Sequence, residues 1–143
     1  MRKRVGEWDI EMEMLNYARQ RVIEALRIPR RVVLATSGPA GLQANEFSCE
    51  SVELYLFLLV PKTSDHLFNL EHDPNVTLLT AGWELKGEAQ VISPNILDLE
   101  LDLLREPEAE WCVLVRVNPC LMQIRKGKGW GYLETIELKG NPI

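Results

Sequence analysis

The sequence predicts a mainly β protein, built as a small antiparallel barrel with flanking helices. Three observations favour this fold class. Six or seven short runs rich in Val, Leu and Ile are separated by turns that contain Gly, Pro or Asn. A helical pattern is confined to the N-terminal segment and to two shorter stretches. Closure into a barrel would also remove the exposed edges that short strands otherwise leave.

Length and composition are those of one globular domain. The chain has 143 residues, of which 46% are hydrophobic and 26% are charged. A chain of this length can bury a hydrophobic core. We therefore expect a single domain over residues 1–143, with an N-terminal helical segment at 1–29 and the barrel at 30–138.

Charge and cysteine content exclude several classes of protein. The net charge of −5 argues against a nucleic-acid-binding surface. The longest apolar run, residues 54–60, is too short to span a membrane, and no apolar segment follows the basic residues 2–4 as in a secretory signal. Three cysteines without Cys-x-x-Cys spacing indicate reduced thiols. We expect a cytoplasmic protein.

The first helix is predicted from apolar residues that recur every three or four positions. Asp9 fits its N-cap, and Pro29 lies just beyond its end. We expect the apolar face to pack on the rest of the protein, although the same face would also fit a partner helix. This face consists of Trp8, Met12, Leu15, Ala18, Val22 and Leu26.

The strands follow in regular order after this helix. The run at 53–60 is apolar on both faces and should be central, and Gly87 inside a later run indicates a β-bulge. Ser64 fits the N-cap of a short helix that ends near Asp73 and Pro74. Eight runs fit strands, and we expect six or seven strands from them; the runs are residues 31–37, 42–49, 53–60, 75–80, 84–92, 111–117, 121–125 and 132–138.

Residues 93–104 fit two structures. The leucines at positions 97, 99, 101 and 103 alternate with acidic residues, as in a strand. Ser93 and Pro94, however, have the order of an N-cap followed by proline at the first helical position. We predict a helix here.

Residues 61–66, Pro-Lys-Thr-Ser-Asp-His, join the end of a strand to the start of a helix. Lys62 offers a cation, Thr63 and Ser64 offer hydroxyls, and the first helical turn offers unpaired backbone N–H groups. A phosphate would be expected to bind at such a junction. A plain helix cap at Ser64 and a solvated Lys62 are the alternative.

The order of these features resembles the flavin-binding split barrels related to pyridoxamine 5′-phosphate oxidase. The resemblance is clearest over residues 32–91 and looser through 113–119. The matching pieces are Leu34-Ala35-Thr36 before a Gly-containing turn, Leu54-Tyr55-Leu56-Phe57, Ser64-x-His66 at a helix start, Asn69-Leu70 with Pro74-x-Val76, and Gly87-Glu88-Ala89.

The resemblance implies a split barrel that forms a homodimer, with flavin mononucleotide (FMN) in a cleft between the subunits. Relatives often carry lysine where this chain has His66, and Arg-Pro where it has Leu42-Gln43. Both departures remove positive charge from the phosphate end. The cofactor-binding residues that we expect are Ala35, Thr36, Gln43, Asn45, Lys62, Thr63, Ser64, His66 and Trp130.

The tryptophans are the other candidates for contact with a cofactor. Trp83, Trp111 and Trp130 each have a side chain that can stack on a flat ring. For Trp130, in the Gly-rich basic loop 125–131, a hairpin turn beside a core tryptophan is the favoured alternative. The sequence has no cluster with metal-ligand spacing and no Gly-x-Ser-x-Gly nucleophile elbow. No catalytic acid or base is identified.

Two functions follow from the resemblance. The first is an FMN-dependent oxidoreductase that acts on a small-molecule substrate, which the sequence does not name. The second is a non-catalytic flavin, haem or small-ligand binding protein on the same barrel. The departures at His66 and Leu42-Gln43 favour the second.

Overall fold

Six antiparallel strands close into a barrel, and a seventh strand pairs with the C-terminal part of the sixth. The computed structural model describes residues 2–93, 100–125 and 132–138, with side chains for 13–93, 100–125 and 134–138. The strand order is β3-β2-β1-β4-β5-β6-β7, and a further β3–β6 pairing closes the barrel. The strands are β1 (Arg31–Thr36), β2 (Gln43–Val52), β3 (Tyr55–Pro61), β4 (Asn75–Leu79), β5 (Trp83–Ile92), β6 (Cys112–Arg125) and β7 (Tyr132–Glu137).

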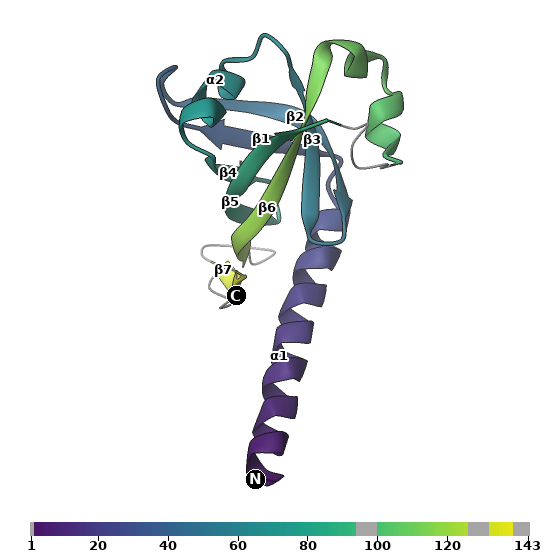
Figure 1. Ribbon diagram of the computed structural model, residues 1–143, viewed down its shortest axis with the longest axis vertical. Coiled ribbons are helices and arrows are strands. Elements are labelled where there is room, and N and C mark those ends of the chain that lie inside the picture. The colour runs from purple at the N-terminus through teal and green to yellow at the C-terminus, as the bar shows by residue number, and fades with distance from the viewer. Residues whose placement is uncertain (1, 94–99, 126–131, 139–143) are drawn as a thin grey trace.

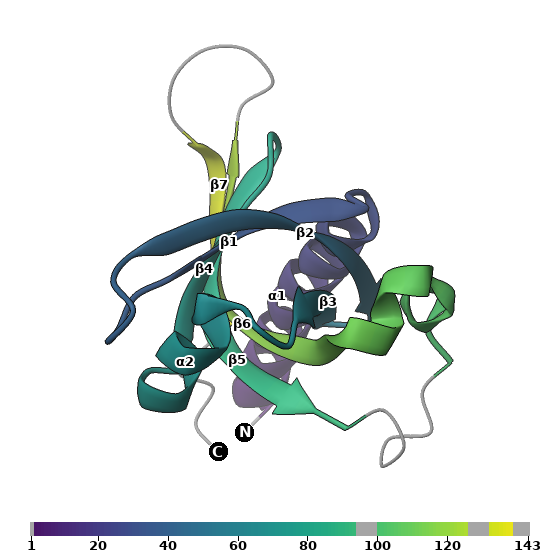
Figure 2. The ribbon, with the colours of Figure 1, turned by 90° about the horizontal axis from the view of Figure 1, so that it is seen from above.

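The helices flank this barrel. They are α1 (Arg2–Arg27), α2 (Asp65–His72) and two 3-10 turns, η1 (Asp102–Arg105) and η2 (Pro107–Trp111). Seen from above, α2 and the 3-10 turns lie on opposite sides of the barrel (Figure 2). The long helix α1 leaves the lower end of the barrel, with the N-terminus far from it (Figure 1). The predicted fold class, a mainly β split barrel with an N-terminal helix, is confirmed.

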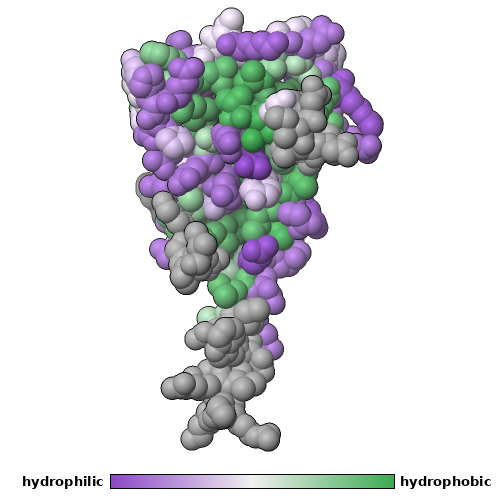
Figure 3. Space-filling model, in the orientation of Figure 1, coloured by the Kyte–Doolittle hydropathy of each residue, from purple (hydrophilic) through white to green (hydrophobic). Residues whose placement is uncertain are grey.

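Two apolar clusters lie on the two faces of β3. Its residues Leu56, Leu58 and Val60 point into the barrel, where they join the main core. Phe57 and Leu59 point outward and pack beneath leucines of the η1 segment and β6. The prediction that this strand is covered on both faces is therefore confirmed. On the face seen in Figure 3, hydrophobic side chains gather over the upper barrel between hydrophilic rims.

The C-terminal turns of α1 close the lower end of the barrel. Val22 and Leu26 are completely buried in the main core, and Trp83 Nε1 on β5 donates to the carbonyl of Ala25 at 3.1 Å. Leu15, on the same predicted face, is 46% exposed. The predicted packing face is thus confirmed for its C-terminal half. The predicted N-cap at Asp9 is wrong, because α1 already begins at Arg2.

The turn between β2 and β3 differs from the prediction. A strand was expected from residue 53, but Val52 pairs with Tyr55 and leaves a two-residue turn between them. Glu53 in this turn has a φ of 53°, in the left-handed region. Two-residue turns are usually recognised from glycine or asparagine, and this turn contains neither. The sequence therefore did not predict it.

One continuous strand replaces the two predicted around Asn118 and Pro119. β6 pairs with β5 along its length, with a register shift at Lys86/Gly87 opposite Pro119. The predicted bulge at Gly87 is confirmed. A Cβ at Gly87 would lie 2.5 Å from the carbonyl oxygen of Asn118, so only glycine permits this approach of the two backbones. The bulge accommodates proline inside a long strand.

The predicted helix at 93–104 is not formed where the structure describes it. Residues 94–99 lie outside the described residues, Leu101 is extended, and only the single 3-10 turn η1 follows. Leu101 and Leu103 are each 3% exposed and pack against Phe57 and Leu114. Burial of these two leucines therefore accompanies an extended residue and one 3-10 turn at the described end of this segment, in place of the predicted helix.

Candidate functional site

A chain of hydrogen bonds joins the first turn of α2 to β1 and β2. His66 is 1% exposed. Its Nδ1 lies 2.8 Å from Thr36 Oγ1, and its Nε2 lies 2.9 Å from Asn45 Oδ1. An amide oxygen only accepts, so Nε2 carries the proton and Nδ1 accepts the proton of the Thr36 hydroxyl. His66 is therefore a neutral imidazole with both ring nitrogens satisfied.

Asn69 extends this network to the turn between β1 and β2. Its side chain is completely buried. Nδ2 donates to Thr36 Oγ1 at 3.1 Å and to the carbonyl of Gly41 at 2.9 Å, while Oδ1 accepts from Ala40 N at 2.9 Å. A Cβ at Gly38 would lie 2.9 Å from Asn69 Oδ1, so the turn closes tightly on this amide.

Asn69 was not among the cofactor-binding residues predicted from the sequence. The available signal was its spacing of three residues from His66, which places both polar side chains on one face of a short helix. Both are the buried residues of that helix. Two polar residues on the inward face of a helix require partners, and this requirement predicts a hydrogen-bond network.

Burial lowers the pKa of His66 below its ordinary value, and the nearby Asp65 carboxylate opposes this only in part. The ring also meets the edge of Phe47, with centroids 5.4 Å apart. His66 was expected to contact a phosphate. In the structure any such contact through a ring nitrogen would have to replace the bond to Thr36 or Asn45, and the ring would bring no positive charge.

The residues just before α2 are available to a ligand. Ser64 Oγ accepts from His66 N at 3.2 Å, which confirms the predicted N-cap. Its hydroxyl proton remains available to donate. Lys62 and Thr63 are exposed, and Lys62 Nζ donates to the carbonyl of Glu110 at 3.2 Å. Asp65, also exposed, places a carboxylate in the same turn. One cation and one anion therefore flank the hydroxyls.

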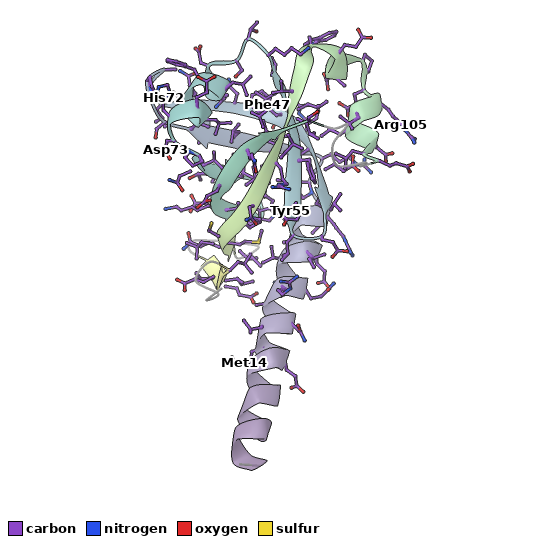
Figure 4. All side chains as sticks on the ribbon, viewed as in Figure 1. Met14, Phe47, Tyr55, His72, Asp73 and Arg105 are labelled. Carbon is purple, nitrogen blue, oxygen red and sulfur yellow. The ribbon has the colours of Figure 1, made fainter. Side chains whose placement is uncertain are left out.

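Two further predicted residues lie elsewhere. Ala35 and Thr36 line a cleft of about 450 Å³ on the outer face of the sheet, together with Thr77, Lys86 and Cys120. The cleft reaches Asp73, just past the end of α2, which Figure 4 labels beside His72. Lys62, Thr63 and Ser64 do not line it. The structure thus divides the predicted cofactor residues between the start of α2 and this cleft.

Gln43 and Asn45 lie on the same side of β2, as their alternation predicted. Asn45 Oδ1 is bonded to His66, and Gln43 Nε2 donates to the carbonyl of Ala40 at 3.0 Å. Each amide has one end engaged within the protein. The other ends, Gln43 Oε1 and Asn45 Nδ2, make no hydrogen bond to another described residue and are free to meet a ligand.

The tryptophans have different environments. Trp83 is 3% exposed in the main core, so it has a packing role. Trp111, the last residue of η2, is 57% exposed. Trp130 lies outside the described residues. A stacking role for Trp83 is therefore excluded by burial, whereas the surface of Trp111 is available.

The described residues contain no group of three or more His, Cys, Asp or Glu side chains that would hold a metal ion. Burial raises the pKa of the Cys49 thiol to about 12, so this thiol stays protonated at neutral pH. Within the same part of the chain, no helix combines the length and hydropathy that crossing a membrane requires.

No protein-family model and no curated protein matches this sequence. Solved structures do. A protein assigned as a pyridoxamine 5′-phosphate oxidase from Listeria innocua is 16% identical with a TM-score of 0.51, covering 81% of this chain and 98% of its own. The fold is the split barrel. The predicted resemblance is confirmed at this level.

Two other similar structures have names that state a ligand. A FAD-binding protein from Mesorhizobium loti is 10% identical with a TM-score of 0.57, over 72% of this chain and 90% of its own. A haem-binding protein from Mycobacterium smegmatis is 19% identical with a TM-score of 0.61, over 84% of this chain and 57% of its own. At these identities the likeness establishes the fold.

Proposed function

We propose that this protein is a flavin-binding split barrel that holds FMN in a cleft between two subunits of a homodimer. The shared fold with a FAD-binding protein and with an assigned pyridoxamine 5′-phosphate oxidase supports the class of ligand. The observation that carries the proposal is the start of α2. There the buried Thr36 and His66, with the exposed Asn45 bonded to His66, hold a segment on which Lys62 and Thr63 are exposed.

The phosphate end of FMN fits Lys62, Thr63 and Ser64. The phosphate is close to dianionic at neutral pH and needs cations, hydroxyls and N–H groups. Lys62 is held by a single hydrogen bond to the Glu110 carbonyl, which an exposed side chain exchanges at little cost. Asp65 reduces the positive potential at this point. The donor set therefore accepts a phosphate but binds it with moderate strength.

The remaining polar contacts fit the other parts of the cofactor. Gln43 Oε1 and Asn45 Nδ2 are available to the ribityl chain or to the edge of the ring, since their opposite ends are bonded within the protein. Because the network holds Asn45 in one orientation, a contact at its amide would be preorganised. Ala35 and Thr36 would contribute chiefly backbone groups.

Bound FMN would supply hydride or electron transfer to a small-molecule substrate. The part of the protein is then to bind and orient the cofactor. His66 does not act as an acid or base at the ring, because both of its nitrogens are engaged and it stays neutral. An oxidoreductase of this type takes its chemistry from the flavin and its selectivity from the cleft.

A non-catalytic binding function is the second candidate. The hydrogen bonds of both His66 ring nitrogens favour a non-catalytic function. With both nitrogens bonded within the protein, this histidine is available neither as an acid or base nor as a ligand to a haem iron. The outer cleft of about 450 Å³ has the size of a small-ligand site and carries Lys86, Thr77 and Ser37. A small ligand bound there would leave the start of α2 unused.

The absorption spectrum of the purified protein, followed by titration with FMN, tests these proposals. Flavin absorption bands, or binding of added FMN at micromolar concentration, support the first. We expect Lys62→Ala with Ser64→Ala to weaken FMN binding without unfolding the barrel, and Lys86→Ala, which removes a lysine of the outer cleft, to leave it unchanged. A colourless protein that fails to bind FMN contradicts the flavin proposal.

A further inference from the structure

The floor of the outer cleft is a row of side chains that crosses three strands. Ala35 on β1 lies opposite Thr77 on β4, and Thr77 lies opposite Lys86 on β5. Side chains alternate along a strand, so this row faces outward where its sequence neighbours face the main core. Those neighbours are Leu34, Leu78 and Leu85. Ala35 and Gly87 occupy little volume in the lining, which leaves the hollow of about 450 Å³.

One end of the outer cleft is positive. Lys86 is exposed, and its ammonium makes no hydrogen bond or ion pair with another described residue. The Thr77 hydroxyl beside it also has no partner in the part of the chain that the structure describes. Three N–H donors and one hydroxyl therefore lie close together and are available to an acceptor. A carboxylate matches this set of donors.

The other end of the cleft is negative. Asp73, just past the end of α2, lines it (Figure 4). Its Oδ1 accepts from Asn75 N at 3.0 Å and from Asn75 Nδ2 at 2.9 Å. Asp73 Oδ2 and Asn75 Oδ1 make no hydrogen bond within the described residues, and Asp73 makes no ion pair there. Two oxygen acceptors, one of them charged, are thus open to a donor.

The two charges lie apart along β4. Asp73 and Thr77 are separated by four residues of extended chain, about 13 Å, and Lys86 is the neighbour of Thr77. A simple anion would leave Asp73 unpaired, and a simple cation would leave Lys86 unpaired. We propose that the outer cleft binds a small, elongated zwitterion. Its carboxylate accepts from Lys86 Nζ and Thr77 Oγ1, and its ammonium donates to Asp73 Oδ2 and Asn75 Oδ1.

This ligand class rests on the second candidate function, a small ligand in the outer cleft, and makes that function specific. It does not rest on flavin binding, because Lys62, Thr63 and Ser64 do not line the cleft. The polar contacts hold the two ends of the ligand, while Ala35 and Leu42 offer apolar surface to the chain between them. A compound that carries only one of the two charges therefore loses the contacts at one end.

Three compounds of similar chain length test the proposal on the full protein. 6-Aminohexanoate carries both charges, hexanoate lacks the ammonium, and hexylamine lacks the carboxylate. Binding is measured by NMR titration, from the backbone amide shifts of Thr77 and Gly87 in the cleft. Lys86→Gln and Asp73→Asn each remove one charge and keep a side chain of similar size. Lys62→Gln, which removes a lysine at the start of α2, is the matched control.

We expect 6-aminohexanoate to bind about twofold to fivefold more tightly than either other compound, because each exposed charge pair contributes modestly. Lys86→Gln should remove its advantage over hexylamine, Asp73→Asn its advantage over hexanoate, and Lys62→Gln neither. Equal binding of the three compounds overturns the zwitterion and leaves a small-ligand function in place. No shift with any compound, or an unchanged advantage in both cleft variants, also overturns it. Titration with FMN then tests the flavin proposal separately.

Discussion

The inner and outer sides of the start of α2 use similar residues for different purposes. Inside, Thr36, His66 and Asn69 bond to one another and to the backbone, and the described part of the chain contains no buried side-chain N or O atom without a partner. Outside, Lys62 and Thr63 are exposed, and the Lys62 ammonium donates one hydrogen bond, to the carbonyl of Glu110. A hydroxyl-rich and cationic segment can therefore contain a structural half and a half that is open to a ligand.

The largest effect should come from removing the inner side. Asn69→Leu leaves the Ala40 N–H and the Gly41 carbonyl without their partner, and it takes a donor from Thr36. We expect a loss of about 2 to 4 kcal/mol in the free energy of unfolding, measured by urea denaturation, because the variant removes three hydrogen bonds, each of which contributes about 0.5 to 1.5 kcal/mol. Asn75→Ala, at an exposed asparagine, is the control. Equal losses in both variants would contradict the role of the network.

A smaller loss of stability is expected on replacing His66. This variant distinguishes a structural role of the histidine from a role in FMN binding. His66→Leu leaves the Thr36 hydroxyl and Asn45 Oδ1 unpaired. The free energy of unfolding should fall by about 1 to 3 kcal/mol. FMN affinity, measured where the variant is folded, should fall by less than in Lys62→Ala. Unchanged stability with abolished FMN binding would show that His66 contacts the cofactor.

The stability of the inner side should also depend on pH. His66 binds a proton less readily in the folded protein than in the unfolded chain, whose ordinary pKa is about 6.5. Its contribution is complete above that value and is lost as the pH falls through the lower folded pKa. We expect the fall in the urea midpoint between pH 7.5 and 5 to be smaller in His66→Gln than in the unmodified protein. His72→Gln, at the exposed histidine of α2, should retain the full pH dependence.

The outer side should respond weakly and only through phosphate. Asp65→Asn removes the carboxylate beside Ser64, so we expect FMN to bind about twofold to fivefold more tightly, as for other exposed charge pairs. Riboflavin, which lacks the phosphate, should bind equally to both proteins. Fluorescence titration at two salt concentrations measures this difference, which should shrink at high salt. Tighter binding of both ligands would place the effect outside the phosphate site.

Local signals in the sequence predicted much of the fold. Alternation placed the strands, Ser64 was correctly placed as a cap, and Gly87 marked the bulge. The turn at Glu53 carried no glycine, and a 3-10 turn with Leu101 and Leu103 buried stands where the end of a helix was predicted. Such outcomes depend on packing between distant segments, which periodicity does not encode.

The site was harder to predict for the same reason. Ser64 and Lys62 could be recognised from their position before a helix. The inward direction of His66 and Asn69 depends on partners about 30 residues away in sequence, at Thr36 and Gly41. A histidine two residues after the cap therefore looked like a phosphate ligand, whereas its surroundings make it a neutral member of a buried network.

The most direct test of the proposed function is the ratio of FMN to riboflavin affinity in the unmodified protein and in Lys62→Ala. If the start of α2 holds the phosphate, FMN should bind about tenfold more tightly than riboflavin, equivalent to about 1.4 kcal/mol. Lys62→Ala should reduce this ratio about threefold or more and leave riboflavin binding unchanged. Equal affinity for the two ligands, or no measurable binding of either, would contradict the proposed site.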